Sequence, residues 1–416
     1  MLFRAIFFLL FLSLNWSPGL RAQREFITIT KANGTVELPF EYENNFIIIK
    51  TVLNSILPVR FIFDTGAENT VLINRELADL IAVNYQRQVT IYGADLRTEL
   101  KAYVGTGIHF EFNEQLRIAN QTILVLEEDY FQFGTFAGIN VHGIIGADLL
   151  RRFVVKIDYQ RRKITLQDPS RFRPPRPTDY HKIPVDFSRH KPYITLSGDV
   201  FDYQGQQLKL LMDTGANLSL LLYTNRQDSL AALPDNLIPT HIGMGLGGQL
   251  NGFVGRTARV ELGDYTLQNV LTNFQDVTSL LTIDSSLLND RHGIIGNKIL
   301  DRFTLIIDYI REEVYARSNR HFTDEFVYDR SGLSLAANTA GGLHYIVIYV
   351  TPNSPAAEAG IQVGDEIRRI NGLPTYILSL EDIIMRLQRK PGKRIKVVLD
   401  RNGTKIKRSF SLRDLI

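Results

Sequence analysis

Two short motifs in this sequence place a carboxylate where catalysis could use it. The tetrapeptide Asp-Thr-Gly-Ala occurs twice, beginning at Asp64 and at Asp213, and each copy follows a run of apolar residues. A carboxylate at the end of an apolar strand is costly to ionise, so its pKa rises unless other groups compensate. Two such carboxylates in contact share one proton, because adjacent negative charges repel each other. The pair could then supply a general base and a general acid at one pH.

The two motifs belong to a longer internal repeat. The segment His142–Leu166, HGIIGADLLRRFVVKIDYQRRKITL, returns as HGIIGNKILDRFTLIIDYIREEVYA over His292–Ala316. The shorter pairs YVG and FVG, and LPFEY and IPVDF, keep the same order at nearly the same spacing. Ordered markers at this spacing indicate a duplicated lobe, and the repeat is far too long for a solenoid. We therefore expect two lobes of similar fold that bring Asp64 and Asp213 together.

The elements that must position these motifs have the pattern of β-strands. Short runs of Ile, Val, Phe and Tyr alternate with polar residues in both lobes, as in FITITKANGTVEL and FTLIIDY. The segments RELADLIA, GADLLRRF and NKILDRF are expected to form short helices. The predicted fold class is therefore mainly β. A Pro-rich linker at 167–182 separates the predicted lobes, which cover 23–166 and 183–319.

The first 22 residues have the pattern of a secretory signal peptide. Arg4 supplies a positive charge, an apolar run follows from Ala5 to Leu14, and a Pro-Gly break precedes a small-residue cleavage site. The alternative is a membrane anchor, but the apolar run is too short to span a bilayer. We expect an exported protein, periplasmic or extracellular, without a stable membrane span after signal removal.

Composition excludes several classes of function. The 416 residues include no Cys, which excludes disulfides, thiolate chemistry and a Cys-linked lipid anchor. The 47 basic and 44 acidic residues give no bulk attraction to nucleic acid or to a membrane surface. We therefore expect no nucleic-acid partner. A chain of this length predicts two or three domains.

The repeated motif resembles that of the pepsin and retropepsin aspartic peptidase family. Both lobes carry two apolar residues before Asp-Thr-Gly-Ala and, downstream, an Ile-Ile-Gly segment that begins at Ile144 or at Ile294. The resemblance covers residues 24–319 and implies a bilobal pair of double-psi β-barrels. It also implies an endopeptidase that hydrolyses a peptide or protein substrate without metal or cofactor. The alternative is a catalytically silent exported scaffold that binds peptides.

The resemblance implies a role for each matching residue. The two Asp would form the catalytic dyad, the two Thr would join the lobes beneath it, and the two Gly would let backbone N–H groups reach the carboxylates. A flap from each lobe would cover the cleft. The predicted site residues are the catalytic Asp64 and Asp213, the supporting Thr65, Gly66, Thr214 and Gly215, and the flap residues Tyr92, Gly93, Gly243 and Gly245.

The chain departs from pepsin-like enzymes at the residue after the catalytic Gly. Those enzymes usually have Ser there, whereas this chain has Ala67 and Ala216. A Ser hydroxyl that donates to the Asp would favour the charged carboxylate and lower its pKa. Its absence predicts activity at weakly acidic to near-neutral pH.

Two further patterns resemble binding motifs but lack the required context. GMGLGG fits the dinucleotide-binding fingerprint, which needs a following helix, whereas a strand pattern follows it here. His142 and His292 occupy equivalent repeat positions but have no other metal-binding residues at suitable spacing. We expect a packing or hydrogen-bonding role for both His, and predict neither a metal nor a cofactor.

The C-terminal region, predicted as a domain over residues 325–416, has a different pattern. VTPNSPAAEAGIQVGDEIRRING, at 350–372, resembles PDZ domains of bacterial envelope proteases and implies a small α+β domain, with an unrelated β-module as the alternative. A helix is expected from Ser379, where Ser and Asp have capping-box spacing. PDZ domains bind extended peptides by strand addition and hold a terminal carboxylate with backbone N–H groups. The predicted peptide-binding residues are Gly332, Leu333, Ser334 and Leu335.

One residue of this loop departs from the PDZ pattern. Ser334 stands where the family usually has Gly, so the resemblance leaves open whether the groove takes a terminal carboxylate or an internal segment of a peptide or partner.

Overall fold

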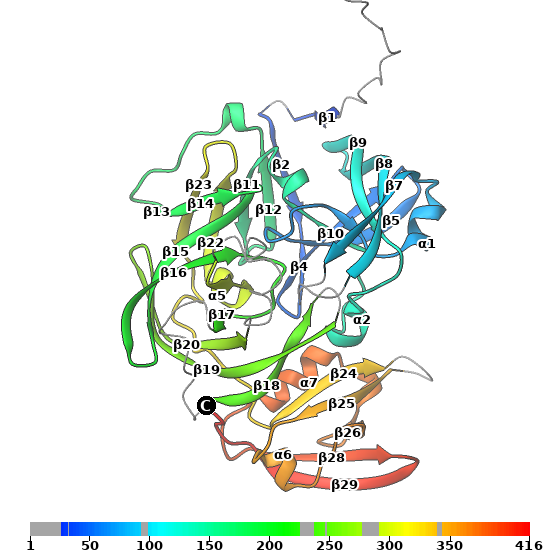
Figure 1. The fold of residues 1–416 in the computed structure, drawn as a ribbon, viewed down its shortest axis with the longest axis vertical. Coiled ribbons are helices and arrows are strands. Elements are labelled where there is room, and N and C mark those ends of the chain that lie inside the picture. Colours follow the sequence, from blue (N-terminus) through cyan, green and yellow to red (C-terminus); the bar gives the residue numbers. More distant parts are fainter. Residues whose placement is uncertain are drawn as a thin grey trace, which may run out of the picture.

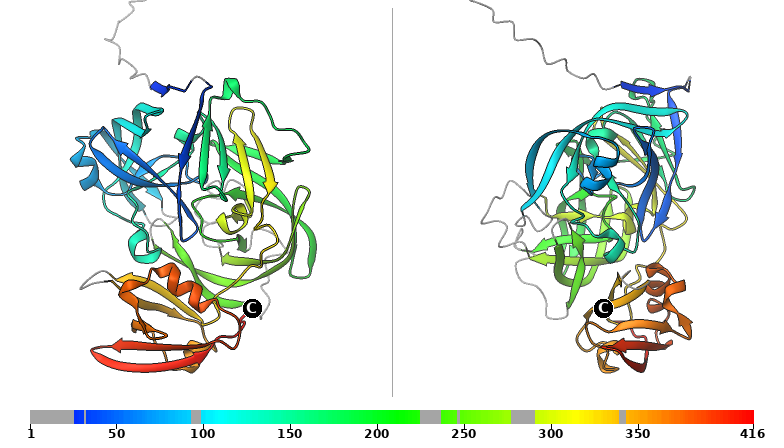
Figure 2. Two further views of the ribbon diagram at one scale, coloured as in Figure 1. Left: turned by 180° about the vertical axis from the view of Figure 1, so that it is seen from behind. Right: turned by 90° about the vertical axis from the view of Figure 1, so that its right-hand side faces the viewer.

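The chain folds into two β-rich lobes and a smaller third domain. The computed structural model describes residues 26–31, 33–92, 99–224, 237–245, 248–276, 291–338 and 343–416, so the predicted signal peptide lies outside the described residues. Figure 1 shows the N-terminal lobe in blue and cyan, the C-terminal lobe in green and yellow, and the third domain in orange and red beneath both. The two views of Figure 2 show the same arrangement from other sides. The predicted mainly β, bilobal architecture is confirmed.

The sheet of the N-terminal lobe places Asp64 directly after a buried strand. Its strands are β1 (Phe26–Ile29), β3 (Glu41–Glu43), β4 (Phe46–Leu53), β5 (Leu57–Phe63), β6 (Val71–Leu72), β7 (Asn84–Tyr92), β8 (Glu99–Asn113), β9 (Leu116–Leu126) and β10 (Gly143–Ile145). They pair in the order β1-β9-β6-β10-β5-β4-β8-β7, with β3 on β4. The last three residues of β5, which are Phe, Ile and Phe, are buried and fix its position in the lobe.

The sheet of the C-terminal lobe repeats this plan around Asp213. Its strands are β14 (Val185–Ser188), β15 (Lys191–Val200), β16 (Tyr203–Met212), β17 (Leu220–Thr224), β18 (Ile238–Gly245), β19 (Gly248–Leu262), β20 (Tyr265–Asp276) and β21 (Gly293–Ile295). They pair in the order β14-β15-β16-β21-β17-β20-β19-β18. The segment after GMGLGG is thus a strand, and the helix that a dinucleotide fingerprint requires is not formed there.

A third sheet joins the two lobes. It contains β2 (Thr35–Pro39), β11 (Val154–Asp158), β12 (Lys163–Gln167), β13 (His181–Ile183), β22 (Phe303–Asp308) and β23 (Glu313–Ser318). The order is β13-β23-β22-β11-β12-β2, so the central antiparallel pair is formed by β11 of one lobe and β22 of the other. These two strands lie in the strongest repeat of the sequence, and equivalent segments of the two lobes therefore meet near the pseudo-symmetry axis.

Three short helices of the lobes lie where the sequence predicts them. The described helices of the lobes are α1 (Arg75–Leu80), α2 (Phe133–Phe136), α3 (Ala147–Leu150) and α5 (Asn297–Leu300), and a 3₁₀ turn, η1, covers Pro169–Arg171 in the predicted linker. The Asn74 side chain caps α1 by accepting from the N–H groups of Glu76 and Leu77. Helix α2 was not predicted. Among the described residues, no helix is long and apolar enough to cross a membrane.

The third domain has its own core and sheet. Its elements are β24 (Leu333–Asn338), β25 (His344–Val350), α6 (Pro355–Glu358), β26 (Glu366–Ile370), β27 (Leu373–Pro374), η4 (Thr375–Ile377), α7 (Leu380–Leu387), β28 (Arg394–Arg401) and β29 (Thr404–Ser411). The sheet order is β24-β25-β26-β28-β29, with β27 on β26, which leaves β24 at an edge. Ser379 and Asp382 form the predicted capping box at the start of α7.

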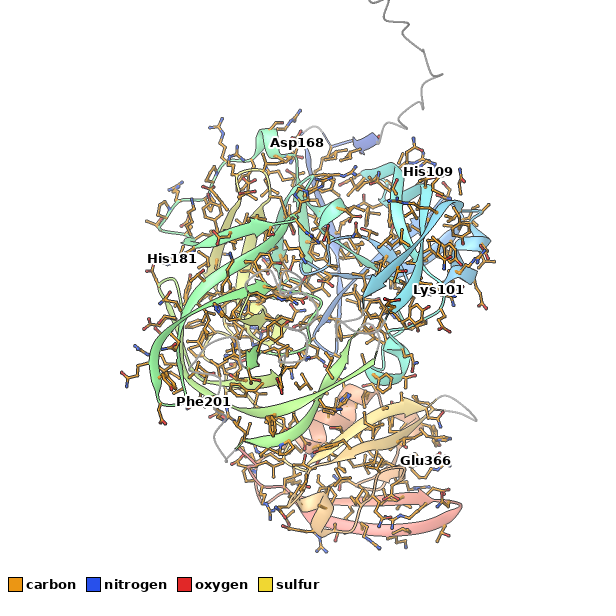
Figure 3. All side chains as sticks on the ribbon, viewed as in Figure 1. Lys101, His109, Asp168, His181, Phe201 and Glu366 are labelled. Carbon is orange, nitrogen blue, oxygen red and sulfur yellow. The ribbon has the colours of Figure 1, made fainter. Side chains whose placement is uncertain are left out.

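The third domain packs against both lobes. The Asn44 N–H donates to Glu381 at 3.4 Å, and the Tyr349 hydroxyl donates to the carbonyl of Pro239 at 3.2 Å. Helix α2 lies against β24 (Figure 1). In Figure 3 the labelled Lys101 and His109 mark the N-terminal lobe, His181 and Phe201 the C-terminal lobe, and Glu366 the third domain. The side of the third domain that carries β24 and α7 therefore faces the lobes.

Candidate active site

The two Asp-Thr-Gly turns meet between the lobes. Asp64 follows β5 and Asp213 follows β16, and the short strands β10 and β21 run parallel to these two strands. The Asp64 N–H donates to the Ile145 carbonyl and the Asp213 N–H donates to the Ile295 carbonyl, both at 3.0 Å. The Ile-Ile-Gly segments thus hold the Asp turns in equivalent positions.

The two Thr side chains join the lobes beneath the Asp pair. The N–H of Thr65 donates to Oγ1 of Thr214 at 3.0 Å, and the N–H of Thr214 donates to Oγ1 of Thr65 at 3.1 Å. The hydroxyl of Thr65 donates to the Met212 carbonyl at 2.6 Å, and that of Thr214 donates to the Phe63 carbonyl at 2.7 Å. Both Thr are fully buried, so these four bonds form without competition from solvent.

The two Gly of the motif allow the carboxyl groups to approach the opposite backbone. A Cβ atom at Gly66 would lie 2.5 Å from Cγ of Asp213, and one at Gly215 would lie 2.4 Å from Cγ of Asp64. Those separations are far below van der Waals contact, so no larger residue fits without displacing a carboxyl group. Each lobe therefore supplies a Gly that packs against the Asp of the other lobe.

The two carboxyl groups interact directly and differ in their hydrogen bonds. Oδ1 of Asp64 accepts from the N–H groups of Gly66 at 2.7 Å and Ala67 at 3.1 Å, whereas Oδ1 of Asp213 accepts from Gly215 at 2.8 Å. Burial, the adjacent Asp213 charge and a hydrogen bond between the carboxyl groups raise the pKa of Asp64 well above its ordinary value. Burial also raises the pKa of Asp213, while the hydrogen bond with Asp64 opposes that rise. The pair therefore retains one proton between its members.

Two cations favour the charged form of Asp213. Arg291 and Lys191 lower the pKa of Asp213 through their charges, although burial is the larger effect and raises it. The Arg291 guanidinium lies 5.5 Å from the ring centroid of the buried Tyr223, which fixes its position in the C-terminal lobe. The charges of these two cations therefore partly offset the effect of burial on Asp213.

The Asp pair lies in a cleft of about 410 Å³ with apolar walls from both lobes. Phe131 stacks on Phe133 with ring centroids 4.9 Å apart, and Phe133 meets Phe46 edge to face at 5.9 Å. The apolar side chains that line the cleft include Phe46, Ile62, Phe131, Phe133, Phe136 and Ile144 from the N-terminal lobe, and Leu218, Leu221, Ile242, Leu250 and Ile294 from the C-terminal lobe. The cleft can therefore accept an extended apolar chain across the Asp pair.

The predicted flap residues are described in part. Gly243 lies in β18 and lines the cleft, and Gly245 ends that strand and pairs with Gly248 at the start of β19. The β18 and β19 strands thus contribute Ile242, Gly243 and Leu250 to the wall of the cleft on the side of the C-terminal lobe. Tyr92 is the last residue of β7, and Gly93 lies outside the described residues. The flap role stays a prediction.

The paired His residues have a structural role. The N–H of Arg60 donates to Nδ1 of His142 at 3.1 Å, and that of Lys209 donates to Nδ1 of His292 at 2.9 Å. Both His thus connect a barrel strand to the Ile-Ile-Gly segment, as the predicted hydrogen-bonding role requires. In the part of the chain that the structure describes, no cluster of three His, Asp or Glu could hold a metal ion.

A buried Asn near the Asp pair was not among the predicted site residues. The side chain of Asn297 donates to the carbonyls of Asn45 at 2.7 Å and Thr214 at 2.5 Å, and its Oδ1 accepts from Tyr159 at 2.7 Å. It therefore connects the Asp213 turn to the N-terminal lobe. A comparison of the two repeats could have identified it, because the N-terminal repeat has the small apolar Ala147 at this position and the C-terminal repeat has the polar Asn297.

The predicted peptide-binding residues of the third domain begin the edge strand β24. Gly332 has a φ of 82°, and Leu333, Ser334 and Leu335 follow it in the strand. The carboxylate of Asp329 lies beside the residues that precede β24. It accepts hydrogen bonds from the N–H groups of Ser331 and Gly332 and from the Ser331 hydroxyl. Burial raises the pKa of Asp329 to about 6, although these bonds lower it.

Comparisons with known proteins agree with this geometry. A family model described as aspartyl protease matches residues 49–149 and 200–299, one segment in each lobe. A second model, described as PDZ domain, matches residues 346–401. No curated protein matches the chain.

Proposed function

The chain contains two copies of an aspartyl protease domain and a C-terminal PDZ domain, and from this premise we propose that it is an exported aspartic endopeptidase. The observation that carries the proposal is the contact of Asp64 and Asp213 at the base of a cleft shared by both lobes. Both carboxyl groups are present, which argues against a catalytically silent scaffold.

The proposed reaction transfers protons through the two Asp. The Asp213 carboxylate removes a proton from a water molecule, whose oxygen attacks the carbonyl carbon of the scissile peptide bond. Asp64 donates its proton to the carbonyl oxygen, which gives a tetrahedral diol. When the diol collapses, the C–N bond breaks and the amine nitrogen takes the proton from Asp213. Asp64 recovers its proton from the diol, and the pair returns to its starting state.

The assignment of Asp213 as the base follows from its surroundings. Arg291 and Lys191 favour its negative charge, whereas the interactions of Asp64 with Asp213 raise the pKa of Asp64. A base must be charged and an acid must be protonated at the working pH. The same raised pKa values support activity at weakly acidic to near-neutral pH.

The substrate class follows from the cleft. Its walls are apolar on both sides of the Asp pair, and β18 and β19 supply part of the wall from the C-terminal lobe. We expect an unfolded or extended polypeptide with apolar side chains flanking the cut bond, because burial of apolar surface provides most of the binding energy in such a cleft. The signal-peptide pattern supports action outside the cytoplasm.

The test is cleavage of a randomised dodecapeptide mixture by the purified protein, with cut sites identified by mass spectrometry. The wild type should cut between apolar residues at weakly acidic to neutral pH, and products formed in ¹⁸O-water should carry one ¹⁸O at the new C-terminus. The Asp64→Asn/Asp213→Asn double variant is the control and should yield no products. If the wild type also yields none between about pH 4 and pH 8, the peptide-binding scaffold becomes the better description.

A further inference from the structure

Helix α2 lies between the catalytic cleft and the third domain. Two of its residues, Phe133 and Phe136, line the cleft. The same helix contacts β24, the edge strand of the third domain. Figure 1 shows α2 at the lower end of the N-terminal lobe, just above β24. One short helix therefore connects the wall of the cleft to a domain whose described residues do not line the cleft.

The helix is too short to hold its own position. It has a single turn, and none of its four residues, all of which are described, is buried. Gln132 at its N-cap has a φ of 48°, and its side chain forms no capping hydrogen bond. A helix of one turn is unstable by itself, because nucleation costs more than so few hydrogen bonds return. The position of α2 therefore depends on the groups that pack against it.

Asn44 and Gly138 connect the end of α2 to the start of α7. The Asn44 side chain donates to the carbonyl of Ala137 at 3.0 Å, and the Asn44 N–H donates to Glu381 at 3.4 Å. Gly138 has a φ of 65°, and a Cβ atom there would lie 2.9 Å from Cβ of Leu380. Leu380 is buried in the core of the third domain, so it presents a fixed surface to Gly138. The third domain therefore holds α2 at its C-terminal end.

The wall that includes α2 reaches the Asp pair. Phe133 and Ala137 pack against one apolar cluster, together with Ala67. The Ala67 N–H donates to Oδ1 of Asp64 at 3.1 Å. Phe133 also meets Phe46 of the same cluster edge to face, with ring centroids 5.9 Å apart. A displacement of α2 would therefore change the apolar pocket beside Asp64, where a side chain of the substrate would be buried.

We propose that the third domain sets the shape of the substrate pocket beside Asp64 by holding α2 through Leu380 and Glu381. These two are positioning residues, because neither lines the cleft and both act through the contacts at the end of α2. The inference rests on the proposed endopeptidase function and adds to it a determinant of side-chain specificity. A wall that is held in place favours one size of apolar side chain, whereas a wall that shifts discriminates less.

Two Leu residues of α7 give a matched pair of variants. Leu380 and Leu387 are 3% and 2% exposed and belong to the same core, so truncation of either leaves a similar cavity in the third domain. Leu380 faces Gly138, whereas Leu387 lies about two turns further along the helix and lines a small cavity beside β18. Leu380→Ala and Leu387→Ala should therefore destabilise the third domain to a similar extent, but only Leu380→Ala should release α2.

The test is side-chain preference measured on short peptides. A cut site from the dodecapeptide mixture defines a parent peptide, and two series replace the residue on either side of the cut bond by Phe or by Ala. The full-length wild type should favour Phe on both sides, because the cleft walls are apolar. Leu380→Ala should reduce the Phe-to-Ala ratio of kcat/KM about fivefold on one side only, through KM, with kcat changed less than about twofold. Leu387→Ala should keep both ratios.

A third variant tests the same link without a cavity in the core. Glu381 is exposed, and Glu381→Ala removes the acceptor of the Asn44 N–H. This variant should reduce the same Phe-to-Ala ratio about twofold, and it decides the point if Leu380→Ala does not fold. The proposal is wrong if the folded variants at Leu380 and Glu381 keep both ratios, or if Leu387→Ala changes them as much as Leu380→Ala does.

Failure of the proposed function itself would look different, because a fluorescent reporter on α2 needs no cleavage. The only Trp of the sequence, Trp16, lies in the predicted signal peptide, so Phe136→Trp would place a single Trp of the remaining chain in the cleft wall. Acrylamide quenching of this Trp should rise about twofold when Leu380→Ala is added, and it should stay unchanged with Leu387→Ala. That result without cleavage of any peptide would contradict the endopeptidase and support the positioning of α2 by the third domain. Equal quenching in all three proteins would overturn the positioning role.

Discussion

The two lobes carry the same Asp-Thr-Gly-Ala motif in different electrostatic surroundings. The N-terminal lobe has the buried Val141 at the position equivalent to Arg291. Strand β4 begins with Phe46, whereas the equivalent strand β15 of the C-terminal lobe begins with Lys191. Val141 and Phe46 belong to one apolar cluster, whereas the two cations lower the pKa of Asp213. The two lobes share the geometry of the turns, but only the C-terminal lobe places these two cations where their charges favour the charged form of its Asp.

The two lobes also differ in the buried side-chain hydrogen bonds that join them. Tyr159 of the N-terminal lobe donates to Asn297 of the C-terminal lobe at 2.7 Å. The repeat position equivalent to Tyr159 is Tyr309, and the position equivalent to Asn297 is Ala147. Ala147 has no side-chain acceptor, and the Tyr309 hydroxyl has no hydrogen-bond partner among the described residues. The Tyr–Asn hydrogen bond between the lobes is therefore present at one of the two equivalent positions and absent at the other, as far as the described residues show.

The largest expected effect tests whether both lobes are needed for catalysis. Asp64→Asn and Asp213→Asn should each lower kcat by about 1,000-fold or more, because general acid and general base act in the same step. Each variant should also melt at a higher temperature than the wild type at pH 7. Measurement of peptide cleavage and thermal unfolding on the same samples checks both statements, and appreciable turnover by either variant would remove the two-Asp mechanism.

The sign of the stability effect follows from the raised pKa values. A carboxyl group whose pKa is higher in the folded protein stabilises the fold below its ordinary pKa, and this contribution is lost as pH rises through the folded pKa. Burial raises the pKa of both Asp. The gain in melting temperature of the Asn variants should therefore shrink as the pH falls towards about 4.

The second prediction concerns the two equivalent Tyr. Tyr159→Phe removes the donor to the buried Asn297 and should lower the free energy of unfolding by about 1–2 kcal/mol. Tyr309→Phe removes a hydroxyl without a partner in the described chain and should leave the free energy of unfolding nearly unchanged or slightly higher. Both Tyr are 7% exposed, so each variant controls for the other. Urea unfolding curves that show equal losses would contradict the asymmetry.

A third prediction removes the positive charge near Asp213. Arg291→Leu should raise the pKa of Asp213, so the acid limb of the kcat/KM profile should move to higher pH and activity on that limb should fall about fivefold. Arg291→Lys keeps the charge and should keep the limb in place. A limb that stays unmoved in Arg291→Leu would show that the two lobes do not differ in this respect.

The smallest expected effect concerns the residue after each catalytic Gly. A Ser hydroxyl that donates to the adjacent Asp lowers its pKa, so Ala216→Ser should move the acid limb to lower pH and raise kcat/KM there about twofold. Ala67→Ser should have the lesser effect, because Oδ1 of Asp64 already accepts two N–H groups and that of Asp213 accepts one. The pH profiles of the two single variants decide the point: equal shifts, or a shift to higher pH, would refute it.

The sequence by itself determined those features of the protein that depend on a few neighbouring residues or that occur in both repeats. The two Asp-Thr-Gly turns, the lobe duplication and the cap at Ser379 could all be predicted from it. Turn residues, capping pairs and alternating apolar residues act over a few positions, so each carries its own signal. The repeat then indicated that the two Asp meet, because equivalent lobes pack about a common axis.

Tertiary structure alone decided which side chains surround the Asp pair and where the third domain sits. Arg291, Lys191 and Asn297 lie far along the chain from the groups they affect or bind, and no spacing rule predicts such contacts. The position of the third domain depends on the packing of its β24 and α7 side against β18 and α2, which leaves no periodic pattern in the sequence. Local propensity therefore specified the two Asp-Thr-Gly turns, and long-range packing decided which charged and polar groups surround the Asp pair and where the third domain lies.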